Sequence, residues 1–174
     1  PYFRDPQLLE LAKSQGTASA LSSAYARFSK DMFKHLHGAF TCIVADPAQG
    51  RLLAAVDRLG QHSLYFKKID DSLMFGSSAG DVLGGAVEGG NLLKQGIYNY
   101  LYFHMVPAPG TVYDGLSKLS AAHYLEFANG EYRCHCYWRP QFTETTQGRS
   151  LEQATGELLD VLRTSLRNTL PSEG

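Results

Sequence analysis

The sequence predicts an α/β fold in which helices pack on mainly antiparallel strands. Apolar residues recur every three or four positions from Thr17 to Leu36, which is the spacing of one buried helix face. The segments 39–45 and 51–56 are nearly all apolar, and the residues between them, from Asp46 to Gly50, favour a tight turn. Because both faces of these two strands are apolar, we expect their sheet to be covered on both sides.

Turn and cap residues place the other elements. Asp5 and Pro6 suit the N-cap and first position of a short helix that ends at Gly16. Asn129-Gly130 predicts a second hairpin. The expected elements are strands 64–69 and 73–75, a helical turn at 79–83, a helix at 91–104, hairpin strands 124–127 and 132–137, and a final helix capped by Ser150.

A polar linker at 143–148 is the predicted domain boundary. We therefore assign residues 1–142 to one domain. Residues 143–174 are expected to be a linker and the first helix of a following domain.

Composition excludes several classes of protein. The chain has 174 residues, of which 44% are hydrophobic and 19% charged, with a net charge of -1, as in an ordinary globular domain. It has neither a basic stripe for nucleic acid nor the roughly 20 consecutive apolar residues that span a bilayer. An odd number of cysteines, three, and the lack of a signal-peptide pattern favour a reducing compartment, so we expect a cytoplasmic protein.

The run Cys134-His135-Cys136 invites a metal-site hypothesis. In a strand the two thiols point to one face and the imidazole to the other, so the three groups do not converge on one ion. We predict no metal site. The glycine-rich segment from Gly84 to Gly90 lacks the Lys-Ser/Thr ending of a phosphate loop. We expect this segment to be a flexible linker.

Several segments, in order, resemble one family. They are Gly38-Ala39-Phe40 through Asp46, Val56-Asp57-Arg58-Leu59-Gly60 with Leu64-Tyr65-Phe66, Phe75-Gly76-Ser77-Ser78, Tyr100-Leu101 with Val106-Pro107-Ala108-Pro109, Gly115-Leu116-Ser117-Lys118-Leu119 with His123-Tyr124-Leu125, and Tyr137-Trp138. Their order and spacing are similar to those of class II glutamine amidotransferase domains of the asparagine synthase (glutamine-hydrolysing) family.

The resemblance implies a partial Ntn-hydrolase-type αββα sandwich within a larger ligase. In this family the N-terminal domain hydrolyses glutamine, and ammonia passes to a C-terminal synthetase domain that uses ATP and magnesium to activate a carboxylate. The family's nucleophile is an N-terminal cysteine, whereas this chain starts with Pro1. We therefore expect an N-terminally truncated domain, inactive by itself and without a cofactor of its own, whose exposed sheet edges favour self-association as a homodimer.

The resemblance also indicates candidate site residues. Thr17 occupies the position of the family's glutamine-binding aspartate. Asp57, Arg58, Gly60 and His62 form a loop expected near the synthetase domain. Asp57 and Arg58 either bind a ligand or form a structural ion pair that orders the loop, and we favour the ion pair. His62 is the histidine that we select for an acid–base test.

Two alternatives remain open. The parent protein has lost glutaminase activity and keeps this domain as a scaffold, which Thr17 and Ser78 favour because the family usually has acidic residues there. Otherwise the domain is a non-catalytic interaction module. The sequence leaves the acceptor carboxylate open.

Overall fold

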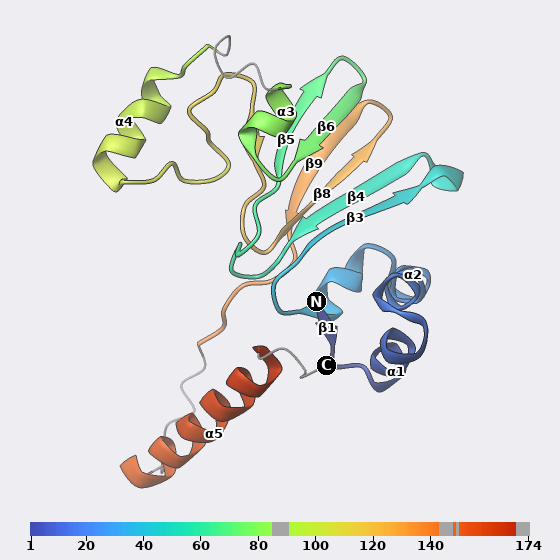
Figure 1. Ribbon diagram of the computed structural model, residues 1–174, viewed down its shortest axis with the longest axis vertical. Helices are drawn as coiled ribbons and strands as arrows, with labels where there is room; N and C mark the ends of the chain where they lie inside the picture. Colours follow the sequence, from blue (N-terminus) through green and yellow to red (C-terminus); the bar gives the residue numbers. More distant parts are fainter. Residues whose placement is uncertain (85–90, 143–147, 149, 170–174) are drawn as a thin grey trace. The chain divides into compact units, whose positions relative to one another are not determined.

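The computed structural model describes residues 1–84, 91–142, 148 and 150–169 (Figure 1). The chain divides into two compact units, Pro1–Arg139 and Pro140–Gly174. The glycine-rich segment after Gly84 and most of the predicted linker lie outside the described residues. The domain boundary at residue 143 stays a prediction.

Helices form the N-terminal layer of the first unit. Helix α1 (Pro6–Gln15) begins as predicted, because the Asp5 carboxylate accepts hydrogen bonds from Gln7 N at 3.0 Å and Leu8 N at 3.1 Å. Helix α2 (Thr17–Phe28) follows. The prediction of one helix through Leu36 was wrong, because Ser29 has a positive φ of 49° and the chain continues as the 3₁₀-helix η1 (Ser29–His35).

A four-stranded antiparallel sheet is the centre of the unit. It contains β3 (Thr41–Asp46), β4 (Arg51–Val56), β8 (His123–Ala128) and β9 (Glu131–Cys136), in the order β3-β4-β8-β9. Both predicted hairpins are confirmed. Their turns use left-handed backbone at Gly50 (φ 57°) and at Asn129 and Gly130 (φ 52° and 71°).

The remaining elements are shorter. They are β1 (Tyr2–Phe3) paired with β2 (Leu36–His37), the turn helix η2 (Pro47–Gln49), a sheet of β6 (Ser72–Gly76), β5 (Tyr65–Ile69) and β7 (Ser117–Lys118), and helices α3 (Ala79–Leu83) and α4 (Lys94–Phe103). In the second unit, α5 (Leu151–Thr169) begins at Ser150, whose hydroxyl accepts from Gln153 N at 3.2 Å, as the sequence predicts.

Two apolar clusters show how the layers pack. Phe33, Met32 and Leu8 pack with Leu53 on the helix-facing side of the four-stranded sheet. On the other side, Leu125 belongs to a second cluster between the two sheets. Figure 1 shows α1 and α2 on one face of this sheet and the β5–β6 hairpin across the other, with α3 beside it. The predicted mixed α/β fold with antiparallel sheets is therefore confirmed, and it is consistent with a partial αββα sandwich.

Strand β3 differs from the prediction. Cys42 is buried among the helix-side residues, but Ile43 on the opposite face is 48% exposed. Ile43 pairs with Ala54, so it lies on the side that faces the second sheet. Strand β3 is an edge strand of its sheet, and the three-stranded sheet leaves this part of it uncovered. The expectation that both faces of the hairpin are covered holds for β4 and is wrong for β3.

Helix α4 makes its closest approach to the rest of the unit through glycine. A Cβ on Gly96 would lie 2.6 Å from the Thr111 carbonyl oxygen, so only glycine allows this contact. The aromatic side chains of the helix instead face outward, and Tyr98 stacks on Tyr102 with ring centroids 6.1 Å apart.

Candidate functional site in the loop after β4

The Asp57 carboxylate organises the loop that follows β4. Asp57 is 1% exposed. One carboxylate oxygen accepts hydrogen bonds from the backbone N–H groups of Leu59 and Gln61, both at 3.1 Å. The other accepts from His62 N at 3.1 Å and Phe40 N at 3.4 Å. These four donors occupy the four acceptor positions of the carboxylate.

Burial and hydrogen bonding oppose each other at Asp57. Burial raises its pKa, but the backbone donors outweigh burial and hold the pKa below the ordinary value of 3.8. Asp57 is therefore ionised at neutral pH. Its backbone is also held, because its carbonyl oxygen accepts from Ala122 N at 2.9 Å.

Arg58 orders the loop differently from the prediction. Its Nη2 donates to the Lys34 carbonyl oxygen at 3.0 Å, and its guanidinium lies 5.4 Å from the centre of the Trp138 ring. Among the described residues, no ion pair joins Arg58 to Asp57. The predicted ion pair was wrong, because the carboxylate is filled by backbone donors and leaves no position for the arginine.

Gly60 gives the loop its tight turn. Its φ is +66°, and a Cβ at this position would lie 3.1 Å from the Ala121 Cβ. Gly60 N also donates to the Asp57 carbonyl oxygen at 3.1 Å. A side chain at Gly60 would thus meet both backbone strain and a close neighbour.

His62 lies beside an open cavity of about 570 Å³. The cavity is lined by Pro1, Ala39, Phe40, Thr41, Gln61, His62, Ser63 and Ser77. Its side chains are thus mainly neutral and polar, and it borders the start of β3. The same loop also borders a second cavity of about 260 Å³, which includes Arg58.

Thr17 does not join this site. It is the exposed first residue of α2 and lines neither of the two cavities beside the loop. The structure therefore brings together Asp57, Arg58, Gly60 and His62 but leaves Thr17 apart from them.

The three cysteines have separate environments. Cys42 is buried, which raises the pKa of its thiol to about 11. Cys134 is exposed, and Cys136 Sγ donates to the Trp138 carbonyl oxygen at 3.1 Å. In the part of the chain that the structure describes, no group of three His, Cys, Asp or Glu side chains is arranged to hold a metal ion.

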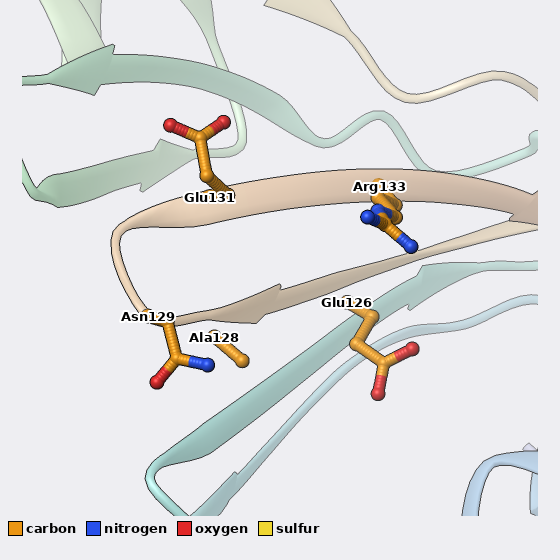
Figure 2. A pocket seen from close by; sticks show the side chains of 5 residues that line it. All are labelled: Glu126, Ala128, Asn129, Glu131 and Arg133. Carbon is orange, nitrogen blue, oxygen red and sulfur yellow. The ribbon is translucent and has the colours of Figure 1, made fainter.

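A further cavity, of about 430 Å³, lies along the β8–β9 hairpin (Figure 2). Its two carboxylates already have cationic partners within the fold. Glu126 accepts from Arg51 at 3.4 Å, and Glu131 accepts from Lys68 at 2.7 Å. The first pair joins neighbouring strands β8 and β4, and the second joins β9 to β5 of the other sheet. We assign both carboxylates to structural ion pairs, because each is compensated by a cation.

Comparison with known proteins identifies the family. A family profile described as "Glutamine amidotransferase domain" matches residues 8–138. This chain belongs to that family. The match spans the N-terminal helices, both sheets and the Asp57 loop, so the loop is part of the amidotransferase domain.

One curated relative of this amidotransferase domain is "Asparagine synthetase [glutamine-hydrolyzing] 3" of Bacillus subtilis (strain 168). It is 27% identical over 127 residues, which are 72% of this chain and 21% of the relative. The chain thus spans about a fifth of the relative's length. The resemblance to an asparagine-synthase-type domain seen in the sequence is confirmed.

The sequence indicated Tyr137 only through the family resemblance, and the contact by which it holds the start of the amidotransferase loop was missed. The buried Tyr137 hydroxyl donates to the Val56 carbonyl oxygen at 2.7 Å, and Tyr137 N donates to the Ala122 carbonyl oxygen at 2.9 Å. Burial raises the pKa of Tyr137. Tyr137 lies 81 residues from Val56 in the sequence, so no local pattern indicates this contact.

None of the helices that the structure describes is long and apolar enough to cross a bilayer. The cytoplasmic assignment stays a prediction.

Proposed function

We propose that this amidotransferase domain is part of an asparagine-synthase-like ligase, which transfers the amide nitrogen of glutamine to a carboxylate activated by ATP. The observation that carries the proposal is the family match over residues 8–138 together with the likeness to a glutamine-hydrolysing asparagine synthetase. In this proposal ATP and magnesium bind a synthetase domain of the same protein, and glutamine is the nitrogen donor.

The cavity beside His62 supports a role in holding an amide. Its lining has the Gln61 amide and the hydroxyl groups of Ser63, Ser77 and Thr41. Such groups donate and accept hydrogen bonds without charge, which suits a neutral carboxamide. The loop that carries Gln61 and His62 is fixed by the buried Asp57 carboxylate, so the cavity wall is preorganised.

The isolated chain should not turn over glutamine. The reactive form of a cysteine nucleophile is the thiolate, and Cys42 is a buried thiol whose pKa of about 11 keeps it protonated at neutral pH. The resemblance instead assigns the nucleophile to an N-terminal cysteine.

A scaffold role is the second candidate. It is favoured by Thr17, which is exposed and uncharged, and by Ser78, whose hydroxyl accepts from Asp81 N at 3.2 Å as the N-cap of α3. Neither residue supplies the negative charge found at these positions in the family. In this case the ligase takes free ammonia or an internal amine.

The test is amide formation by the natural protein that contains this segment, with glutamine and with ammonium as alternative donors. Glutamine-dependent product and glutamate release support the amidotransferase role. Product with ammonium alone supports the scaffold. If the natural protein forms no amide and consumes no ATP with either donor over a panel of carboxylates, the ligase proposal is wrong.

Self-association is a separate proposal about this chain. Strand β3 is an outer strand with an exposed Ile43, and unpaired strand edges favour pairing with a second copy. Sedimentation of the chain should show a dimer, and Ile43→Lys should shift it toward monomer. An unchanged monomer at all concentrations would count against the proposal.

A further inference from the structure

The second cavity beside the Asp57 loop, of about 260 Å³, is lined by several cationic or ring side chains. They include Arg4 after β1, His37 on β2, Arg58 in the loop, and the rings of Tyr2 and Trp138. Tyr2 stacks on His37 with ring centroids 5.5 Å apart. Short strands β1 and β2 thus bring Arg4 and His37 to the same cavity as Arg58.

The positive charge of this cavity is not compensated by hydrogen-bonded anions of the protein. Asp57 is the one carboxylate in the lining, and its oxygens already accept four backbone N–H groups. Arg4 makes no hydrogen bond or ion pair with another described residue. The guanidinium groups of Arg4 and Arg58 therefore line the cavity with N–H donors that have no acceptor in the described structure.

Two observations at the neighbouring groups agree with this excess of positive charge. The Nε of Arg58 is buried and has no hydrogen-bond partner in the structure. Burial, and then the charges of Arg58, Arg4 and His35, lower the pKa of His37 to about 4. At neutral pH His37 is therefore uncharged and still has an N–H to donate.

We propose that this cavity binds a small oxyanion, a carboxylate or a phosphoryl group, between the guanidinium groups of Arg4 and Arg58. A planar guanidinium forms paired, charge-assisted hydrogen bonds with such groups, which a compact ammonium cannot match. The anion fills the cavity that includes His37, whose lining shares only Gln61 with that of the amide cavity. It is thus a second site, and its occupancy does not depend on glutamine chemistry.

Trp138 provides a direct reporter of binding. It is the single tryptophan of the sequence, and the Arg58 guanidinium lies over its ring. An anion that forms hydrogen bonds with Arg58 changes the electrostatic environment of the indole ring. The fluorescence of Trp138 should therefore change with anion concentration until the site is saturated.

The experiment titrates the 174-residue chain with inorganic phosphate and, separately, with acetate, at constant ionic strength held by chloride. We expect saturable binding of at least one of the two probes. Arg4→Gln should weaken it on the order of tenfold, because one charged set of donors is lost. Arg4 is exposed and lies outside the apolar core, so this variant should fold normally.

Arg133→Gln is the matched control, since Arg133 is an exposed arginine of the separate β8–β9 cavity. It should leave the affinity within about twofold of the parent chain. Binding of phosphate alone identifies a phosphoryl site, and binding of acetate alone identifies a carboxylate site. A linear response to both probes, or equal weakening by Arg4→Gln and Arg133→Gln, would overturn the proposal.

Discussion

Replacing Asp57 with asparagine tests whether one buried carboxylate holds the loop. The amide keeps one oxygen for two of the four backbone donors and turns its own NH₂ group toward the other two. Leaving a buried donor without an acceptor costs about 1–3 kcal/mol, and more when the lost acceptor was charged. Two such donors in a site that is 1% exposed therefore predict that Asp57→Asn lowers the free energy of unfolding by about 3–5 kcal/mol.

Urea denaturation followed by Trp138 fluorescence and by circular dichroism measures this difference. Asp70→Asn is the control, because Asp70 is exposed and its φ of 51° suits asparagine. It should change stability by less than about 0.5 kcal/mol. A loss below about 1 kcal/mol for Asp57→Asn would show that the backbone bonds to Asp57 contribute little net stability.

The pH dependence gives the same experiment a second readout. The folded pKa of Asp57 lies below its ordinary value of 3.8, so the unfolded chain takes up the proton first as pH falls. The stabilisation is fully present above pH 3.8 and is lost as pH falls through the folded pKa. The gap between the parent chain and Asp57→Asn should therefore narrow in acid.

Three further outcomes follow from single residues. Gly60→Ala should cost about 1–3 kcal/mol, measured by urea denaturation, because the position has a positive φ and the new Cβ would press on Ala121. Gly50→Ala, at a left-handed φ of 57° but with no neighbour within 4 Å, should cost less. His37 has a folded pKa of about 4 against an ordinary 6.5, so the unfolded chain is protonated first and stability should fall by up to about 3 kcal/mol as the pH decreases from 6.5 to 4. His37→Gln should flatten that slope. Cys42 should resist alkylation until the chain unfolds, and alkylation of the native chain at Cys42 as fast as in urea would contradict its burial.

Local sequence patterns predicted the elements whose causes are local. The Asp5 cap, the Gly50 turn and the Asn129-Gly130 turn each depend on residues within one or two turns of backbone, and all three are observed. The end of α2 was missed because serine, the residue at position 29, is not a residue type that signals a positive φ. The apolar spacing of α2 continues through the 3₁₀-helix η1, so the sequence pattern does not reveal where the α-helix ends.

Contacts between segments that are far apart in the sequence could not be predicted from local sequence patterns. The pairing of Arg51 with Ala128 joins strands far apart in the sequence, and the exposure of Ile43 depends on which strand lies beside it. The same holds for the site. The sequence indicated Asp57 and Arg58 together, but only the fold reveals that the carboxylate takes backbone donors and that the arginine lies over Trp138.

The manner in which Asp57 holds its loop has an evolutionary consequence. The carboxylate accepts hydrogen bonds from the backbone N–H groups of Leu59, Gln61 and His62 and from none of their side chains. Every residue except proline carries such an N–H group. Substitutions at these three positions can therefore accumulate without refolding the loop. Related domains can therefore carry different side chains in the lining of the neighbouring cavity and keep the same loop backbone. Proline is the replacement that selection should remove at these positions, because it lacks the N–H group.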